Sequence, residues 1–456
     1  MPSSLTKMKQ FVPHWVAMNR IPMNSTAIKA AARYFAALSA LLVGVSGDSH
    51  GADDVASSLT IQAGNADRPA GPVRVSVDLP TALIQGNVMP SVKLKLASGE
   101  VIPGQVTPRS LLAIASKETK STASELVFIA PAMKAGQALQ ADVLFGPATK
   151  TERDGFHWSD KDGKSRELAF AERPVMRYMY ERLDNSTPER RGETYKIYHH
   201  VFDPRGTKLV TKGPGGLFPH HRGLFYGFNR IQYADGKKKA DTWHCNNGEF
   251  QSHEQFVAEE SGPVLGRHRL RIDWHGQDGA VFAQEERELT AYQIAGGTII
   301  DFASRLTSMV GKVKLDGDPQ HAGFQFRASQ EVPDKTAKQT YYLRPDGKGE
   351  PEKFRNWDDK TRDPSTVNLP WLGLAFVLGD QRYTCLYIDR PENPKESRFS
   401  ERDYGRFGCY FEYELDEGKP LELSYRVWLQ EGEMSVEQAR AVAGLFANPL
   451  TATWKK

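Results

Sequence analysis

The chain has 456 residues, of which 39% are hydrophobic, and carries 59 Lys and Arg against 56 Asp and Glu, a formal net charge of +3. Five of the basic residues but only one acid, Asp48, lie within residues 1–52. The remainder is close to neutral, which gives no basis for a nucleic-acid partner or for a role at an anionic membrane. The three cysteines are too few for a disulfide framework. If one bond forms, we expect it between Cys385 and Cys409, which both lie in strand-like segments.

The first segment with a clear pattern is a short apolar stretch at residues 34–45, preceded by Lys29 and Arg33 and followed by small residues. A basic region, roughly 7–15 apolar residues and a small-residue exit are typical of a secretory signal peptide. The stretch is shorter than the about 20 apolar residues that a membrane-spanning helix needs. We therefore expect residues 1–52 to be a signal peptide cleaved near Ala52. The mature protein would be exported to the periplasm or beyond, with no integral membrane segment.

Two β-rich regions follow. Residues 53–150 predict a small N-terminal β-sandwich domain, because alternating runs such as 73–77 and 92–96 are interrupted by Gly and Pro. Residues 151–456 have longer strands and polar hairpin turns, and predict a large antiparallel β-sandwich. The fold class is therefore all-β.

One helix closes the second region. Ser435 and Gln438 have the spacing of a capping box, and helix-forming residues continue from Ala439 to Phe446. Asn448 and Pro449 then end the pattern. We expect this helix to pack on a sheet as a structural cap.

Histidines are concentrated in the middle of the second region. Nine of the twelve lie between residues 199 and 321: His199, His200, His220, His221, His244, His253, His268, His275 and His321. The densest element is the run Pro219-His220-His221-Arg222-Gly223, which Trp243-His244 follows about twenty residues later. Imidazole suits proton transfer or metal binding near neutral pH. The cluster therefore predicts a site.

Two strands can be assigned by face, because side chains alternate along a strand. In residues 267–275, His268 shares a face with apolar side chains, so we expect it in the core. In residues 321–328, Phe324 and Phe326 share the apolar face. The other face carries His321, Gly323, Gln325 and Arg327. That polar face suits either the floor of a ligand groove or a solvent-facing strand.

The first functional hypothesis is acid–base catalysis on a sugar ring, with histidines that transfer protons and an arginine that holds an oxyanion or a carboxylate. Trp243 could stack on a pyranose face, and Asp241 or Glu254 could be an acid partner. The catalytic candidates are His220, His221, Arg222, His244 and His321. The substrate-binding candidates are Trp243, Gln325, Arg327 and Tyr226.

Two alternatives stay open. One is a divalent-metal site in a sugar lyase or hydrolase, since His220, His221, His244, His253 and Glu254 offer nitrogen and oxygen donors. Their spacing matches no established metal motif. The other is a non-catalytic protein that binds glycan in the same groove.

Several of these segments resemble a family of exported bacterial proteins. The resembling segments are Arg173-Pro174-Val175, Phe202-Asp203-Pro204-Arg205-Gly206, Pro219-His220-His221-Arg222-Gly223-Leu224, Asp241-Thr242-Trp243-His244, residues 321–327 and Tyr425-Arg426. The family is called PmoA-like, is common in planctomycetes and is a domain of unknown function. Methane oxidation, which its other label (methane oxygenase PmoA) implies, requires several spanning helices, and the sequence predicts none after its leader. The resemblance implies a galactose-mutarotase-like β-supersandwich and a carbohydrate ligand.

These interpretations lead to one spatial prediction. We expect seven side chains to converge around one groove: His220, His221, Arg222, His244, His321, Gln325 and Arg327. Convergence around a metal would favour metal-assisted sugar chemistry. Convergence beside a carboxylate without metal would favour acid–base catalysis.

Overall fold

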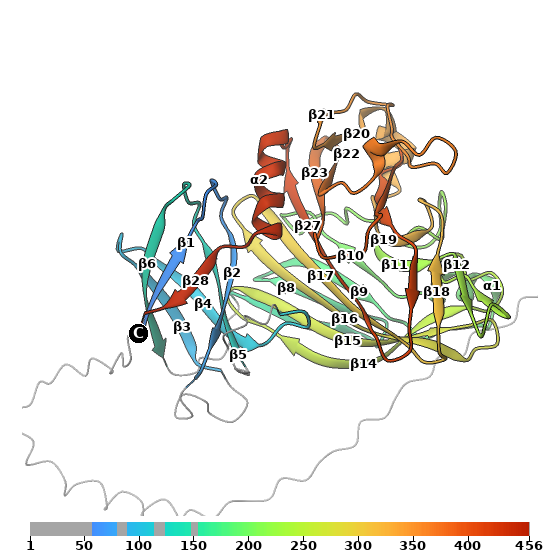
Figure 1. Ribbon diagram of the computed structural model, residues 1–456, viewed down its shortest axis with the longest axis horizontal. Coiled ribbons are helices and arrows are strands. Elements are labelled where there is room, and N and C mark those ends of the chain that lie inside the picture. Colours follow the sequence, from blue (N-terminus) through green and yellow to red (C-terminus); the bar gives the residue numbers. More distant parts are fainter. Residues whose placement is uncertain (1–56, 80–88, 114–123, 147–153, 456) are drawn as a thin grey trace, which may run out of the picture. The chain divides into compact units, whose positions relative to one another are not determined.

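The structure, a computed structural model, describes residues 57–79, 89–113, 124–146 and 154–455 (Figure 1). The expected signal peptide, residues 1–52, lies outside the described residues. The rest is built from antiparallel strands, with helices α1 (Pro188–Thr194) and α2 (Val436–Ala447) and the short helices η2 (Val332–Thr336), η3 (Ala337–Gln339) and η4 (Pro364–Thr366). No helix in this described part is both long and apolar enough to span a membrane. The all-β prediction, with large antiparallel sheets and a C-terminal helix, is confirmed.

The first sheet has seven strands. In spatial order they are β2 (Gly71–Val77), β5 (Ser124–Ala130), β4 (Val101–Pro108), β3 (Ser91–Leu96), β6 (Ala138–Gly146), β1 (Ser57–Gln62) and β28 (Thr451–Trp454). Along β3, Val92, Leu94 and Leu96 are buried and the lysines between them are exposed, as the alternating sequence predicts. The indole N–H of Trp454 in β28 donates to the carbonyl of Ser76 in β2, 2.8 Å away, so the two edge strands approach each other.

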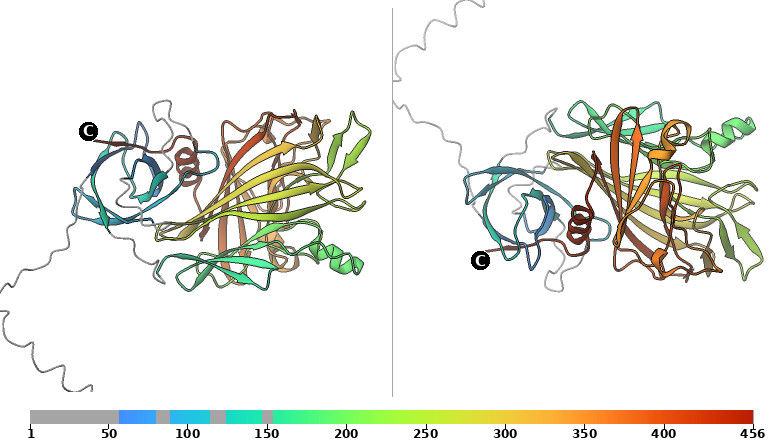
Figure 2. Two further views of the ribbon diagram at one scale, coloured as in Figure 1. Left: turned by 90° about the horizontal axis from the view of Figure 1, so that it is seen from below. Right: turned by 90° about the horizontal axis from the view of Figure 1, so that it is seen from above.

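This sheet differs in detail from the expected sandwich. It is a single sheet that curls around its own core, as the ring of blue strands in Figure 2 shows, instead of two stacked sheets. Its last strand, β28, comes from the C-terminal end of the chain. The domain boundary near residue 150 stays a prediction.

Two larger sheets make up most of the second region. The eight-stranded sheet consists, in order, of β24 (Arg398–Glu401), β25 (Arg406–Tyr410), β19 (Ala322–Arg327), β11 (Leu224–Phe228), β10 (Tyr198–Val201), β9 (Arg173–Met179), β8 (Ser165–Phe170) and β7 (Phe156–Lys161). The nine-stranded sheet consists of β14 (Phe250–Glu260), β15 (Leu265–His275), β16 (Val281–Ile294), β17 (Gly297–Ser308), β27 (Leu421–Glu431), β23 (Gln381–Asp389), β22 (Trp371–Leu378), β20 (Tyr341–Arg344) and β21 (Gly347–Lys348). A four-stranded sheet contains β13 (Lys238–Ala240), β12 (Arg230–Tyr233), β18 (Val313–Asp316) and β26 (Tyr413–Leu415).

The main hydrophobic core lies between the eight- and nine-stranded sheets. Phe324 of β19 stacks on Phe302 of β17 with ring centroids 4.2 Å apart, and Tyr226 of β11 contacts Trp274 of β15 at 5.4 Å. The apolar face expected for residues 322–328 therefore points into this core. His268 is completely buried as expected, and its Nε2 lies 2.9 Å from Nε2 of His199 across the sandwich.

Helix α2 begins where the sequence predicts. The side chain of Ser435 accepts from the backbone N–H of Gln438, and the Gln438 side chain accepts from the backbone N–H of Ser435. Its buried face includes Val442 and Phe446, which join a second cluster with residues of the nine-stranded sheet such as Trp428. The helix is therefore a structural cap, as expected.

The expected disulfide is wrong. Cys385 and Cys409 are both free and buried. Cys385 belongs to β23 in the nine-stranded sheet and Cys409 to β25 in the eight-stranded sheet. The hydroxyl of Tyr387 lies 3.4 Å from the Cys409 sulfur.

Candidate functional site: a three-histidine cluster

Three loops bring four histidines together. His220 and His221 lie in the loop between β10 and β11, His244 in the turn after β13, and His321 directly before β19. The ring centroids of His244 lie 4.6 Å from those of both His220 and His321, and His220 and His321 are 5.3 Å apart. His220, His244 and His321 form the three-histidine cluster. The ring of His221 lies beside it, 5.1 Å from His321.

The cluster lies on the outer face of the eight-stranded sheet. Alternation along β11 turns Tyr226 into the main core, so Phe225 points the other way. Phe225 packs there against Trp243 with ring centroids 5.0 Å apart. The histidines of the site therefore come from loops above a sheet that packs against the main core.

Gly223 ends the loop that carries His220 and His221. Its φ is +39°, and a Cβ at this position would overlap the carbonyl oxygen of His199. Its N–H donates to the carbonyl of Lys212 and its carbonyl accepts from the N–H of Arg327, at 2.9 and 2.8 Å. Only glycine allows so close an approach, so the final residue of the His-His-Arg-Gly run fixes where the loop leaves the sheet.

Asp241 holds His244 in place. One carboxylate oxygen accepts from the backbone N–H groups of Trp243 and His244, at 2.9 and 2.8 Å. The other lies 2.7 Å from Nδ1 of the His244 ring. Because a carboxylate accepts the Nδ1 proton, the neutral form of this ring carries its free lone pair on Nε2.

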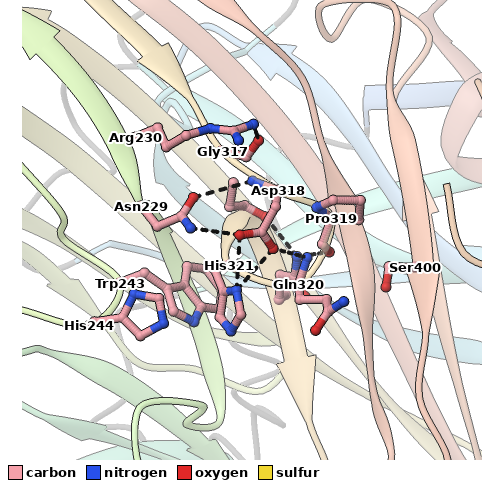
Figure 3. A network of polar contacts seen from close by, with 12 residues as sticks. Asn229, Arg230, Trp243, His244, Gly317, Asp318, Pro319, Gln320, His321 and Ser400 are labelled. Atoms are coloured by element: carbon pink, nitrogen blue, oxygen red, sulfur yellow. Dashed lines mark hydrogen bonds and ion pairs between the residues drawn. The ribbon is translucent and has the colours of Figure 1, made fainter. Parts of the chain in front are cut away.

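Asp318 does the same for His321 (Figure 3). Its two oxygens lie 2.9 and 3.1 Å from Nδ1 of His321, and it also accepts from the Asn229 side-chain amide at 2.7 Å. Burial alone would raise the pKa of Asp318, but the bonds from His321, Gln320 and Asn229 bring it well below its ordinary value. Asp318 is therefore ionised, and the Nε2 of His321 is free.

His220 completes the cluster without a carboxylate. Its Nε2 is buried and has no hydrogen-bond partner among the described residues. Burial, together with the positive charge of Lys196, lowers the pKa of His220 to about 2, so the ring is neutral. One ring nitrogen from each of His220, His244 and His321 lies within 4.8 Å of the others. The side chains of His244 and His321 are 24% and 21% exposed, so a ligand can reach them.

The wall around the cluster is aromatic on one side. Phe218 is 41% exposed, and its ring centroid lies 6.1 Å from His220 and 5.9 Å from His221. It also lies 5.0 Å from Tyr404. Phe218 has a φ of +53°, a conformation that bulky side chains rarely adopt. Such strain is common at functional sites.

The structure separates the nine residues that the sequence singled out. His220, His221, His244 and His321 come together. Trp243 is buried directly beside them, with its ring 5.7 Å from His221 and 6.2 Å from His321. Gln325 and Arg327 are buried behind the cluster, where Gln325 accepts from Arg406 and donates to the carbonyl of Pro319.

Two of the nine lie elsewhere. Tyr226 is in the main core and faces away from the histidines. Arg222 follows His221, but its guanidinium points to helix α1, where it donates to the carbonyls of Gly192 and Glu193. It also donates to the carbonyl of Pro219 in its own loop. The wider metal set does not assemble, because His253 contacts Tyr178 instead, with Nδ1 3.2 Å from its hydroxyl.

Sequence reasoning missed Asp318, Lys196, Phe218 and Tyr404. A signal for Asp318 exists, because Asp241 precedes His244 by three residues and Asp318 precedes His321 by the same spacing. This repeated Asp-x-x-His pattern could have identified both pairs. Among the described residues, Glu254, Asp273 and His275 form a second group whose ligand atoms lie within the same distance of one another.

Fold and site together define an all-β sandwich protein with a solvent-accessible three-histidine cluster on one sheet. The chain belongs to a family of unknown function, DUF6807, whose model matches residues 165–444. Among curated proteins, none matches the chain.

Two solved structures are similar in part. An α-mannosidase from Enterococcus faecalis V583 has 9% identity and a TM-score of 0.42 over 88% of this chain and 46% of its own. A protein in the glycosyl hydrolase family 38 from Enterococcus faecalis has 9% identity and a TM-score of 0.45 over 88% and 47%. This chain thus spans about half the length of each.

Proposed function

We propose that His220, His244 and His321 bind one divalent metal ion, zinc being the best fit, and that the protein is an exported metal-dependent enzyme acting on carbohydrate. The observation that carries the metal is the pair of Asp-x-x-His units together with the unpartnered Nε2 of His220. Three histidine ligands with one open coordination position are a known form of catalytic zinc site.

The ligand set suits such an ion. A metal-binding histidine almost always donates its second ring nitrogen to a carboxylate or carbonyl, which is what His244 and His321 do. Tetrahedral zinc with Zn–N bonds near 2.0–2.1 Å needs ligand nitrogens roughly 3.3 Å apart. The nitrogens here lie within 4.8 Å, so modest ring rotations close the site.

A bound ion of this kind polarises a substrate oxygen and lowers the pKa of a bound water. The protein's own groups do the rest. Asp241 and Asp318 keep the two imidazoles oriented. His221 has a buried Nδ1 without a partner and lies beside His321, and burial together with the charge of Arg406 lowers its pKa well below the ordinary value. A neutral His221 can accept a hydrogen bond from a substrate or water. An anionic ligand beside it would raise its pKa toward the range of a general base for hydrolysis or elimination.

The carbohydrate part of the proposal is supported by the exposed ring of Phe218 next to His220 and His221. An exposed apolar surface beside polar groups is typical of a ligand site. Trp243 is only 1% exposed, so Phe218 takes the stacking role first expected of Trp243. The proposal also includes export, which the apolar segment at residues 34–45 predicts, and a relation to the PmoA-like family, which the sequence motifs resemble. A non-catalytic glycan-binding protein would use the same surface without turnover.

Metal-free acid–base catalysis is the second candidate. The Asp241–His244 and Asp318–His321 pairs, with Nδ1 2.7 and 2.9 Å from a carboxylate oxygen, also suit proton transfer. In that case neither pair would need a metal to work.

The test is a zinc titration of chelator-treated protein. We expect one Zn²⁺ per chain, and we expect His244→Ala and His321→Ala each to weaken binding more than about 100-fold, because a residue that binds the ion directly matters at least as much as its supporting carboxylate. His157→Ala is the matched control, since His157 is exposed and outside the cluster. Absence of stoichiometric binding, or equal affinity of His244→Ala and the control, would contradict the metal proposal.

A further inference from the structure

Buried cations are distributed unevenly in this protein. Seven arginines and two lysines are buried in the described part of the chain. Four of the arginines have a carboxylate partner: Arg267 with Glu260, Arg287 with Glu285, Arg344 with Glu401 and Arg426 with Asp301. The other five cations have no carboxylate within 4.0 Å among these residues: Lys196, Lys212, Arg222, Arg327 and Arg406.

All five unpaired cations lie around the histidine loop. Lys196 donates to the carbonyls of His220 and Trp243. Lys212 donates to carbonyls of the loop that leads to His220, among them that of Gly213.

The three arginines lie next to the same loop. Arg222 follows His221 in the chain. Arg327 and Arg406 are register partners on β19 and β25, and the backbone N–H of Lys212 donates to the carbonyl of Arg327. Arg406 is close enough to His221 for its charge to affect that ring.

Two of these guanidinium groups have unused donors. Arg327 is 1% exposed, and its Nε and Nη2 have no partner among the described residues; Arg406 is fully buried, and its Nε has none. A buried charge without counter-charge is costly, and so is a buried N–H without an acceptor. The nearby carboxylates Asp241 and Asp318 are already engaged by histidines.

We propose that the substrate of this site carries an anionic group, a carboxylate, sulfate or phosphate, which is placed against the Arg327–Arg406 side of the histidine cluster. The inference rests on the proposed function and names its substrate class: an acidic sugar instead of a neutral one. Guanidinium groups favour such oxyanions because their N–H groups match the anion's geometry. The buried arginines add a field that attracts an anion before contact. Burial lowers the pKa of Lys196 and of Lys212 to about 7, and an anion bound nearby would favour their charged forms.

An anion that approaches Arg327 from solvent would first meet the side chain of Phe218. The guanidinium of Arg327 lies 4.8 Å from the ring centroid of Tyr404. The buried Tyr404 ring in turn contacts the exposed ring of Phe218. For an anion to reach the buried free donors of Arg327, the exposed Phe218 side chain would have to rotate away from Tyr404. The sugar ring would stay beside Phe218 and the histidines.

The test compares neutral and anionic sugars by calorimetric titration. The probes are D-glucose, D-glucuronate, glucose 6-phosphate and glucose 6-sulfate, each with zinc-loaded and with metal-stripped protein. We expect at least one anionic probe to bind at least tenfold more tightly than glucose in both forms, and its affinity to fall as ionic strength rises. The probe that binds best identifies the anion. If none of the three anions binds more tightly than glucose, the proposal is wrong.

Variants separate this proposal from the metal site. Arg327→Gln should remove the preference for the anion and leave zinc binding intact, Arg327→Lys should restore part of it, and the exposed Arg205→Gln should change neither. If Arg327→Gln does not fold, Lys212→Met removes a neighbouring charge and should reduce the preference. A preference seen only with zinc bound would show that the anion coordinates the metal, and this inference would fail while the proposed function stands. A preference for the anion in a protein that binds no zinc would support this inference and contradict the proposed metal site.

Discussion

The smallest functional unit in this protein is an aspartate three residues before a histidine. It occurs at Asp241–His244 in a turn and at Asp318–His321 before a strand. In both, the carboxylate accepts the Nδ1 proton and also a backbone N–H of the turn. The same side chain therefore shapes the loop and orients the imidazole, which leaves Nε2 toward the centre of the cluster.

Asp241→Asn tests this role. The amide keeps the shape of the side chain but loses the charge that holds the Nδ1 proton. We expect zinc affinity to fall by about 10- to 100-fold, the range seen for such supporting partners. Binding is measured by competition with a chelator of known affinity.

Asp67→Asn is the control for the loss of one carboxylate, because Asp67 is 61% exposed and pairs with Lys134 and the backbone of Ala135 in the turn between β5 and β6. Equal zinc affinities for the two variants would mean that Asp241 does not support a metal ligand.

At the scale of elements, the site depends on the close contact between a loop and the outer face of a sheet. Gly223 lies where this loop meets β10, and its missing side chain allows contact with the His199 carbonyl. The loop and the strand can therefore not separate without moving His220 and His221. The contact between loop and sheet fixes the positions of the histidines, and the imidazole rings carry the reactive nitrogens.

Gly223→Ala should show this dependence. A Cβ would clash with backbone, and the φ of +39° is unfavourable for alanine. We expect a loss of at least about 2 kcal/mol in the free energy of unfolding, a typical cost of backbone strain and overpacking, together with weaker zinc binding. Urea denaturation and zinc titration measure the two effects.

Gly192→Ala is the matched control. It lies in helix α1 and has open space at the Cβ position. It should be neutral or stabilising by up to about 1 kcal/mol, because alanine is the better helix former. A Gly223→Ala variant as stable as this control would contradict the account.

Local patterns predicted much of the fold. Strand alternation placed Phe324 and His268 correctly in the core, and the capping box placed helix α2. Long-range placement could not be predicted in the same way. Nothing in residues 451–454 indicates that they pair with β1, and nothing around Cys385 and Cys409 shows that they lie in different sheets.

For the site, the sequence predicted which residue types come together better than it predicted where each side chain points. Four histidines converge as the cluster suggested, but Arg222 and Tyr226 point away from it. Arg222 turns to the end of α1 because the loop reverses there, and Tyr226 faces inward because of strand register. The direction of Arg222 depends on tertiary contacts that no local pattern encodes, whereas strand alternation places Tyr226 on the same face as Leu224 and Phe228.

At the scale of the whole molecule, several histidines are buried in the neutral form. Burial lowers the pKa of His200 to about 4, and burial with neighbouring positive charge lowers those of His199 and His268 well below the ordinary value. These rings take up protons on unfolding but not in the folded state. Stability from them is therefore complete above about pH 6.5 and is lost as the pH falls toward the folded-state pKa values.

We expect the free energy of unfolding to be lower at pH 5.0 than at pH 7.5, by up to about 2 kcal/mol for each of these histidines. Urea denaturation at the two pH values measures it. The exposed His157→Gln variant should show the same pH dependence as the unchanged protein. A protein equally stable at both pH values would mean that these rings are not buried in the neutral form.

The central claim is that His220, His244 and His321 form one metal site. The most direct measurement is anomalous X-ray diffraction at the zinc edge from crystals of the zinc-loaded protein. We expect one strong peak about 2.1 Å from a ring nitrogen of each of the three histidines. A peak at Glu254, Asp273 and His275 instead, or no peak between the three histidines, would contradict it.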